Sequence, residues 1–332
     1  MDNKIGNFIN MDNTFNCMAY IETIRRGSAN FYYLTHTIIV EGKTKKVRVL
    51  LGKGKISSRE LNDLAAEAQG KLEEKLASLK KIKKIISLDK EKLEKLDEIK
   101  NGYKKLISSV SKIEYDVIEK DRFIRFTFNT NAIEGSTITL KETSHILKDG
   151  ISPEGKDLRE IHEVENTRKA YNFMKNYKGK INIKFIKKIH YNLTYNILGE
   201  QSGKFRRIQV FMGGSKHIPA KPSEVNKEML NLMRWMNSHS NIHPAVFASY
   251  VHNFFIDVHP FIDGNGRTGR LLLNFMLMKS GFPPICIKKE EKIKYTDYME
   301  EARDGNMKML LNFIAGKVEE AYAELANTIK RN

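Results

Sequence analysis

Two apolar segments of helical spacing, joined by a short glycine-rich segment, most constrain the fold of this 332-residue chain. His243-Pro244 marks the start of the first helix, because proline is favoured in a helix's first turn. Its apolar face is formed by Phe247, Tyr250, Val251, Phe254, Phe255 and Val258. The second apolar segment, residues 271–278, begins a buried helix that Ser280-Gly281 ends. Two such neighbouring helices require a helical body around them, so we expect a mainly α-helical fold.

The rest of the chain contains further helices and two predicted hairpins. Residues 30–40 and 46–51 are rich in aromatic and β-branched types, and Glu41-Gly42 between them is typical of a turn. Ser57 and Glu60 form a capping-box pattern that opens a Lys/Glu/Leu-rich helical stretch reaching residue 120, with a break expected at Asn101-Gly102. Residues 183–190 form an amphipathic helix, and residues 205–218 form a second hairpin that turns at Gly213-Gly214.

These patterns predict three parts. Residues 1–57 form a small β-hairpin region, residues 58–114 form a helical arm or coiled-coil hairpin, and residues 115–332 form the main domain. With 41% hydrophobic residues the chain can bury a core, which excludes a disordered or fibrous protein. Cys17 and Cys286 are too few for a disulfide scaffold, which favours the cytoplasm. The sequence contains no signal-peptide pattern and no membrane-spanning apolar run, so no membrane contact is expected.

A formal net charge of +17 would attract phosphate-rich partners, whether nucleotide, nucleic acid or acidic protein. Nucleic-acid binding is the alternative function from another class, and it would use residues 1–120, where the basic segment 43–55 and the lysine-rich helices lie. A scaffold that forms a homodimer through the helical arm is an equal alternative for that part.

The segment from His259 to Arg270, HPFIDGNGRTGR, contains the residues suited to phosphate chemistry. Gly264, Asn265 and Gly266 can bring backbone N–H groups close to a ligand at the start of a helix, where unpaired amides and the helix dipole favour an anion. Arg267 and Arg270 lie three residues apart in the same first turns, where a cation is unfavourable without an anionic ligand. This arrangement predicts a polyphosphate site.

Two further side chains complete the predicted site. Asp263 is a hard oxygen ligand placed to hold Mg²⁺ against the phosphates, and His259 titrates near neutrality and can accept a proton from an attacking hydroxyl. Gly264-x-Gly266-x-x-Gly269 also matches a dinucleotide-binding pattern, but that pattern must follow a strand, and helical spacing precedes it here. His162-Glu163 lacks the second histidine of a helical zinc site, so we interpret it as part of a solvated helix face.

The same twelve residues match the Fic family motif, His-x-Phe-x-(Asp/Glu)-Gly-Asn-Gly-Arg-x-x-Arg, without a substitution, and the resemblance extends over about residues 115–320. It implies a Fic-type helical bundle with a small β-hairpin flap, and transfer of AMP from ATP to a Tyr, Thr or Ser hydroxyl of a protein, the chain itself included. It also implies that His259 is the general base and Asp263 the Mg²⁺ ligand. Gly264, Asn265 and Gly266 would form the anion hole, and Arg267 and Arg270 would hold the β- and γ-phosphates.

The resemblance implies two more sets of residues. A flap at Arg207, Ile208, Gln209 and Val210 would pair with the target's extended backbone, unless that segment is only a structural hairpin. Tyr295 and Arg303 are the candidates for adenine contact, and core packing is an equal alternative for Tyr295.

A second signature precedes the catalytic one. Residues 130–135, TNAIEG, resemble the family's inhibitory motif on a helix near 120–135, with Glu134 as the inhibitory glutamate. Gly135 is suited to end a helix, which places Glu134 at the negative end of the helix dipole, so a cationic partner is expected. Arg270 is that expected partner, and an exposed glutamate is the alternative. The resemblance leaves open an enzyme that mainly removes AMP or uses another nucleotide donor.

Overall fold

The computed structural model describes residues 19–40, 43–81, 85–212 and 217–330. The chain divides into two compact units, residues 1–85 and 86–332, where the sequence predicted boundaries near residues 57 and 114. The difference arises because the predicted arm is shared between the units: its first helix packs on the N-terminal sheet and its second on the C-terminal helix.

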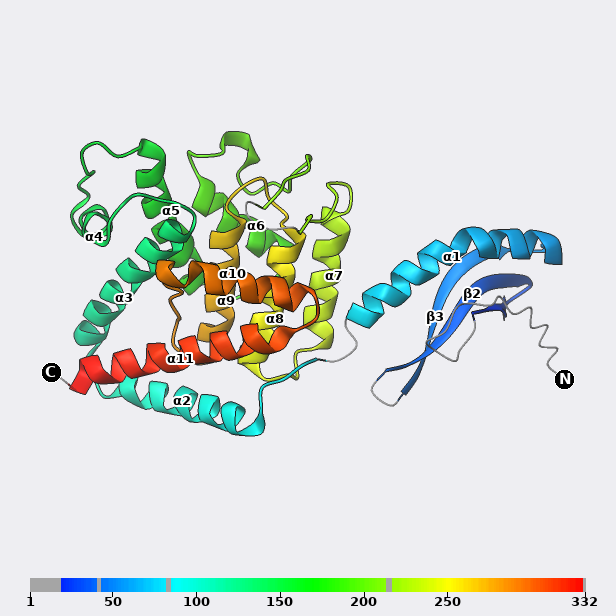
Figure 1. Ribbon diagram of the computed structural model, residues 1–332, viewed down its shortest axis with the longest axis horizontal. Helices are drawn as coiled ribbons and strands as arrows, with labels where there is room; N and C mark the ends of the chain where they lie inside the picture. The colour runs from blue at the N-terminus through cyan, green and yellow to red at the C-terminus, as the bar shows by residue number, and fades with distance from the viewer. Residues whose placement is uncertain (1–18, 41–42, 82–84, 213–216, 331–332) are drawn as a thin grey trace. The chain divides into compact units, whose positions relative to one another are not determined.

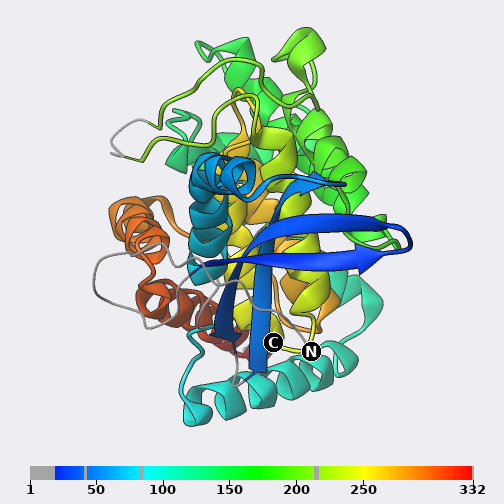
Figure 2. The ribbon, with the colours of Figure 1, turned by 90° about the vertical axis from the view of Figure 1, so that its right-hand side faces the viewer.

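The first unit is a three-stranded antiparallel sheet with one helix. Its strands β1 (Tyr20–Arg26), β2 (Ala29–Val40) and β3 (Lys43–Lys53) lie side by side in chain order (Figures 1 and 2). The predicted hairpin is confirmed and gains β1, while its expected turn at residues 41–42 lies outside the described residues. Helix α1 (Ser58–Lys81) begins as predicted, with the Glu60 amide donating to Ser57 Oγ at 3.2 Å. The core joins the sheet to α1 through Leu34, Val47, Val49, Ala65, Ala68 and Leu72.

The second unit is a helical body built around two buried helices, which confirms the mainly α-helical class. Helices α8 (Pro244–Val258) and α9 (Asn265–Lys279) stand near its middle in Figure 1 and correspond to the two apolar segments of the sequence. The other α-helices described in this unit surround them: α2 (Lys90–Ser108), α3 (Lys112–Ile133), α4 (Leu140–Asp149), α5 (Leu158–Asn176), α6 (Ile183–Thr194), α7 (Val225–Ser238), α10 (Lys292–Arg303) and α11 (Met307–Lys330). Two short 3₁₀ turns, Gly199–Gln201 and Lys289–Glu291, join them.

The break predicted at Asn101-Gly102 is wrong, because α2 continues through both residues. At Gly102 the helix lies against the Tyr322 hydroxyl of α11, so the missing side chain serves close helix packing and not a turn. The breaks lie instead between α1 and α2 and at Ser111, which caps α3 with a complete capping box to Glu114. Within the second unit, α2 packs against α11.

The hairpin predicted at residues 205–218 is also corrected. The structure assigns no strand to the described part of this segment, and Gly213-Gly214 lie outside it. Its two arms are joined by side chains: the Arg206 guanidinium donates to the Ile208 and Ala220 carbonyls, and the Gln209 amide donates to the Pro219 carbonyl. These bonds take the place of a backbone ladder.

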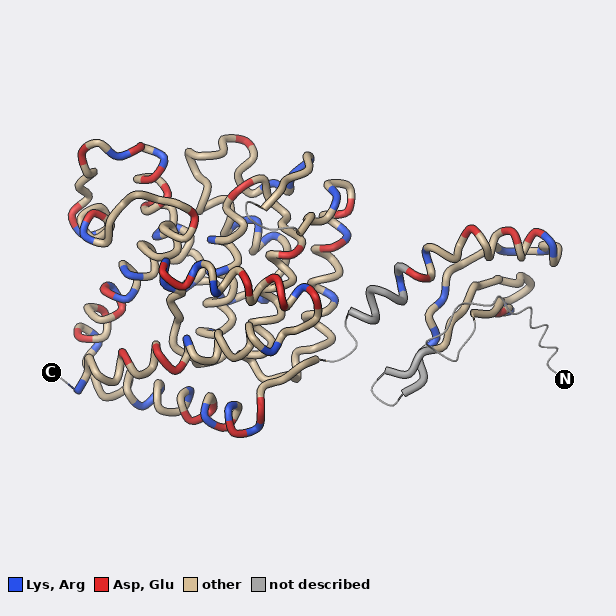
Figure 3. The backbone as a smooth tube through the Cα atoms, in the orientation of Figure 1, with Lys and Arg blue, Asp and Glu red and all other residues tan. Residues whose placement is uncertain are grey.

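Among the described helices, none has both the length and the apolar character needed to cross a membrane. Basic and acidic positions alternate along the outer helices of both units, as the coloured tube in Figure 3 shows.

Candidate active site

His259 ends α8 in a left-handed backbone conformation, with φ of 49°. A non-glycine residue is strained there, so the surroundings must hold it. The Arg206 Nε donates to the His259 carbonyl at 2.8 Å, and the Arg206 side chain is buried. A guanidinium suits this place, because the carbonyl end of a helix attracts cations. Arg206 therefore anchors the flap segment to the residue predicted as the general base.

The His259 imidazole is half-buried and neutral at physiological pH. Burial lowers the pKa of His259 to about 4, while the bond to the Ile256 carbonyl works in the opposite direction. His259 Nδ1 lies 3.3 Å from that carbonyl oxygen, which assigns the ring proton to Nδ1. The lone pair on Nε2 is then available to accept a proton.

Hydrogen bonds within the turn after His259 hold its shape. Asn265 Oδ1 accepts from the Phe261 N–H, and Asn265 Nδ2 donates to the Phe261 carbonyl, each at 2.9 Å. The Phe261 ring stacks on the ring of His190 of α6, with the ring centroids 3.7 Å apart. His190 Nε2 lies 2.8 Å from the Asp263 carbonyl oxygen. The Asn265 side chain thus shapes the loop, and what Asn265 offers a ligand is its backbone N–H.

The N-terminus of α9 carries the two glycines predicted for close approach. Gly264 caps the helix with φ of 76°, and a side chain there would meet Thr194 Cγ2 at 3.1 Å. A side chain at Gly266 would collide with the Glu134 carboxylate. Because the first N–H groups of a helix lack partners within it, this end suits an anion, and a carboxylate lies against it here.

The salt bridge predicted between Glu134 and Arg270 is confirmed. Glu134 follows the last residue of α3, and its Oε1 lies 2.6 Å from Arg270 Nη2. Arg270 also donates to the Thr130 hydroxyl and the Thr130 carbonyl, both at 2.8 Å, and its own side chain is buried. Gly135 has φ of 105°, as expected for the residue that ends a helix. Desolvation is the largest influence and would raise the pKa of Glu134, but the charge and hydrogen bond of Arg270 and the charge of Arg267 together outweigh it and lower that pKa.

Arg267 contacts α5. Its Nη1 lies 3.0 Å from Glu163 Oε1 of α5, and its Nε has no hydrogen-bond partner within the described part of the chain. The solvated face predicted for this part of α5 is wrong for Glu163, which is buried. The reason is tertiary, because the Arg267 charge lies against that helix. The unpartnered buried Nε is a donor suited to an anion near this helix end.

Asp263, the predicted metal ligand, contacts Arg159 of α5. Asp263 Oδ2 lies 2.5 Å from Arg159 Nη2, and Oδ1 accepts from the Gly264 N–H at 2.6 Å. The Asp263 side chain is 43% exposed, and no cluster of three His, Cys, Asp or Glu suited to a metal occurs within the described ranges. A single carboxylate at a phosphate site still fits Mg²⁺, which is commonly held by one or two carboxylates and the substrate phosphates.

The two candidates for adenine contact, Tyr295 and Arg303, have different surroundings. Tyr295 is buried, and its hydroxyl lies 2.5 Å from Nε2 of His252, whose Nδ1 contacts the Gly269 carbonyl. This is the core-packing alternative. Arg303 Nε lies 3.6 Å from Asp257 Oδ1 on α8, and His217 Nε2 contacts the same oxygen at 3.0 Å.

The predicted flap residues differ in exposure. Arg207 is exposed and Ile208 is 58% exposed, whereas Gln209 and Val210 are partly buried. The Gln209 side chain is occupied by backbone carbonyls of its own segment. The segment therefore offers Arg207 and Ile208 to a partner.

Arg206, Arg159 and Glu163 were not among the predicted site residues. Arg206 directly precedes the predicted flap residues. A charged residue within a segment of alternating apolar residues is a local signal that could have identified it. Arg159 and Glu163 meet residues about a hundred positions away in sequence, and no local pattern indicates this.

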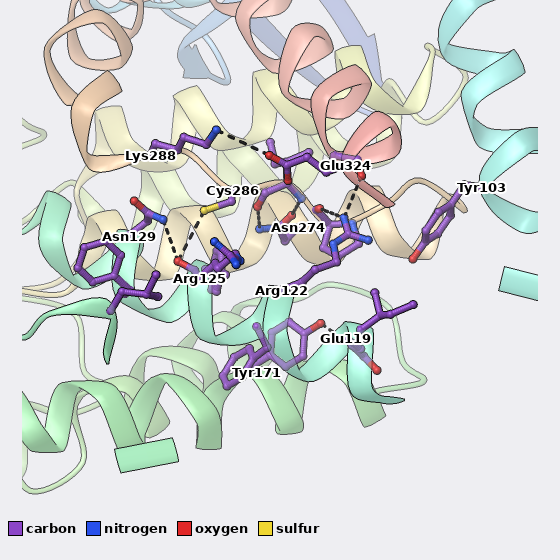
Figure 4. A pocket seen from close by; sticks show the side chains of 18 of the residues that line it. Tyr103, Glu119, Arg122, Arg125, Asn129, Tyr171, Asn274, Cys286, Lys288 and Glu324 are labelled. Carbon is purple, nitrogen blue, oxygen red and sulfur yellow. Dashed lines mark hydrogen bonds and ion pairs between the residues drawn. The ribbon is translucent and has the colours of Figure 1, made fainter. Parts of the chain in front are cut away.

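A separate cavity of about 270 Å³ lies between α3, α5 and α11 and includes none of residues 259–270 (Figure 4). Tyr171, Glu119 and Arg122 project into it, and Cys286 lies at its edge. Arg122 donates to the Pro284 carbonyl at 3.0 Å, so this arginine is occupied in joining α3 to the segment before α10.

Comparisons with known proteins point to one family. Residues 180–277 match the Fic/DOC family model. Proteins named protein adenylyltransferase Fic from Drosophila persimilis and Aedes aegypti are each 33% identical, over 252 and 255 residues. Each alignment covers 74% of this chain and 49% or 50% of the relative, so the chain spans about half the length of the curated relatives it matches.

Solved structures share the fold. A fragment of Fic-1 from C. elegans superposes with a TM-score of 0.66 at 26% identity, over 83% of this chain and 79% of that one. A Fic domain-containing signalling protein from Bacteroides thetaiotaomicron gives a TM-score of 0.65 at 20% identity, over 71% of this chain and 97% of that one, and shows the fold alone. With the unaltered twelve-residue motif folded at the junction of α8 and α9, residues 180–277 form a Fic/DOC family domain.

Proposed function

We propose that this chain transfers AMP from ATP to a hydroxyl group of a protein and that Glu134 restrains the reaction. The observation that carries the proposal is the pairing of a neutral imidazole, His259, with the N-terminus of α9, where Arg270 binds the Glu134 carboxylate beside Gly266. The names of the relatives support the reaction class.

The proposed step is a displacement at the α-phosphorus. The target oxygen forms a bond to that phosphorus, the bond to the oxygen bridging the α- and β-phosphates breaks, and pyrophosphate leaves. His259 Nε2 takes the proton of the attacking hydroxyl. Negative charge grows on the phosphate oxygens, where the amides of Asn265 and Gly266 and the guanidinium of Arg270 stabilise it, while the Gly264 N–H donates to Asp263.

Asp263 is the residue that would hold Mg²⁺, and the ion would neutralise charge on the phosphates when bound. Arg159 holds one Asp263 oxygen in this structure, so that contact must loosen before the carboxylate can bind a metal. Tyr295 stays in the core in this proposal, and Arg207 and Ile208 of the flap contact the target.

We expect Glu134 to restrain the reaction because its carboxylate and a phosphate of ATP compete for the same position beside Arg270. The Glu134 carboxylate lies beside Gly266, at the place a side chain there would occupy, and it binds Arg270 Nη2. A phosphate of ATP must displace it to reach both groups. Because the Glu134 side chain is 38% exposed, it can swing toward solvent without unfolding α3.

Transfer of radiolabel from [α-³²P]ATP to protein tests the reaction, with the chain itself and an added lysate as acceptors. Wild type should label weakly, Glu134→Gly should label more by about 5- to 150-fold, and Glu134→Gly combined with His259→Ala should not label. Glu154→Gly, at an exposed loop position, is the matched control and should equal wild type.

Two results would contradict the proposal separately. Label transfer from [γ-³²P]ATP, or labelling that persists without His259, would overturn the adenylyl transfer. Labelling that depends on His259 but does not rise in Glu134→Gly would overturn only the restraint by Glu134.

A further inference from the structure

We propose that the face of the N-terminal sheet turned away from α1 binds duplex DNA. This goes beyond the proposed adenylyl transfer and uses residues of the first unit alone. The two faces of the sheet differ in kind. Leu34, Val47 and Val49 point toward α1 and are buried, and Ile21 packs with them. Every residue of this unit's core cluster is on that side or on α1.

The strand register places a different set of residues on the opposite face. Tyr20 pairs with Thr35 and Thr35 with Arg48; Glu22 pairs with Tyr33 and Tyr33 with Leu50. Residues paired across antiparallel strands share a face, and residues two apart along a strand do too, so this face includes Tyr20, Glu22, Ile24, Phe31, Tyr33, Thr35, Thr37, Lys46, Arg48, Leu50 and Lys53. Leu50 on this face is 55% exposed, while Thr35 at its centre is buried and donates to the Glu22 carboxylate at 3.1 Å.

Charge on this face favours a polyanion. Lys46, Arg48 and Lys53 are its cations, and Glu22 is its one carboxylate among the described residues. Glu22 Oε1 lies 2.6 Å from Lys46 Nζ, and Glu22 Oε2 lies 2.6 Å from Arg48 Nε. These contacts lower the pKa of Glu22 to about 2, and the hydrogen bond from Arg48 is the largest cause. The carboxylate is therefore always ionised and fixes the two cations side by side. Across residues 20–53 the sequence contains seven Lys and Arg against two acidic residues.

The aromatic side chains favour a duplex over a single strand. Lys46 Nζ lies 5.8 Å above the Tyr20 ring, and Lys53 Nζ lies 5.4 Å above the Phe31 ring. Single-stranded nucleic acid is commonly bound by open aromatic faces on which bases stack, and here lysines cover two of the rings. The outward-facing groups are cations, which contact phosphates.

The dimensions of the sheet also favour DNA. The major groove of B-DNA is about 12 Å wide and admits a two-stranded β-ribbon; β2 and β3, about 5 Å apart, form such a ribbon, and β3 holds Lys46, Arg48 and Lys53. The major groove of double-stranded RNA is deep and narrow, so a sheet face of this width does not enter it. Exposed Leu50 lies among the cations, where an apolar side chain can contact a thymine methyl group.

Fluorescence anisotropy of the full chain with a labelled 20-base-pair DNA tests the proposal. Affinity should fall steeply between 50 and 200 mM KCl, because binding releases counterions from the phosphates. Lys46→Gln/Lys53→Gln should lower affinity at least tenfold and reduce the salt slope by about 1.8, since each lost phosphate contact removes about 0.9. Lys104→Gln/Lys105→Gln, with the same charge change on exposed α2 positions, should bind as wild type.

Leu50→Glu provides an independent variant, because it places a negative charge on the face without breaking an ion pair; it should weaken binding by a similar factor. Circular dichroism confirms that each variant is folded. Absence of salt-dependent binding by wild type, equal loss in the α2 control, or tighter binding to single-stranded RNA of equal length would each overturn the proposal. AMP labelling should be unchanged in the sheet variants, so this outcome is independent of the proposed enzyme activity.

Discussion

The identity of single residues decides the protonation states at the junction of α8 and α9. His259 is held in a strained conformation by Arg206, and its partly buried ring resists protonation. Strain of this kind persists where the surrounding structure enforces it, and it commonly marks a functional residue.

The pH dependence of AMP transfer should report this environment. A base must be neutral to accept a proton, and burial lowers the pKa of His259 to about 4, so activity is present above that value and is lost as the pH falls through it. We expect kcat/KM of Glu134→Gly to remain near its maximum at pH 5.5. A fall centred near the ordinary histidine value of about 6.5, with circular dichroism unchanged, would contradict the burial of this ring.

Cys286 provides a second test of burial. Desolvation raises the pKa of the Cys286 thiol to about 11, and the thiolate is the reactive form. In a Cys17→Ser background, alkylation by iodoacetamide at pH 8 should be at least tenfold slower in the folded chain than in urea. Equal rates in the two states would show that the thiol is not shielded.

At the scale of elements, packing overrides local turn signals. Asn101-Gly102 is typical of a turn, yet α2 passes through it because Gly102 allows α11 to approach closely. Likewise, the alternating residues 205–211 do not form a ladder, since Arg206 and Gln209 satisfy the backbone carbonyls in its place.

Alanine at Gly102 should lower the free energy of unfolding by about 1–3 kcal/mol, because a Cβ there collides with Tyr322. Gly316→Ala on α11 is the matched control: no atom lies within 4 Å of the added Cβ, so it should stabilise the chain by about 0.5–1 kcal/mol. Urea unfolding followed at 222 nm measures both.

Combining Gly102→Ala with Tyr322→Ala separates the two effects. With the ring removed, the alanine should no longer destabilise the helix and should show its ordinary helix-forming advantage. If Gly102→Ala costs the same in both backgrounds, the collision with Tyr322 is not its cause.

At the scale of the whole molecule, each unit has a core of its own. The first is centred on Leu34 and Leu72, and the second surrounds α8 and α9. Separate cores allow separate folding.

A chain that begins at residue 86 should therefore fold and retain AMP transfer in the Glu134→Gly background. The expected result is helical circular dichroism with a cooperative thermal transition, and labelling comparable to that of the full chain. Loss of the transition in the shorter chain would show that residues 1–85 are needed to complete the second unit.

The sequence by itself determined the helical class, the candidate phosphate-binding segment and the expected Glu134–Arg270 salt bridge. Residues 259–270 are contiguous, so the spacing of glycines and charges along one turn and one helix start defines their chemistry locally. Glu134 could be predicted because a glutamate before a helix-ending glycine requires a cation, and the family motif indicated which one.

Only the tertiary structure decided which charges meet elsewhere. Arg159 reaches Asp263 and Glu163 reaches Arg267 across about a hundred residues, and Arg206 secures His259 across 53. Such contacts depend on how α5, α6 and α9 pack against one another, and packing is set by the summed burial of many side chains. A local pattern records what a residue can do, whereas the fold determines which partner it meets.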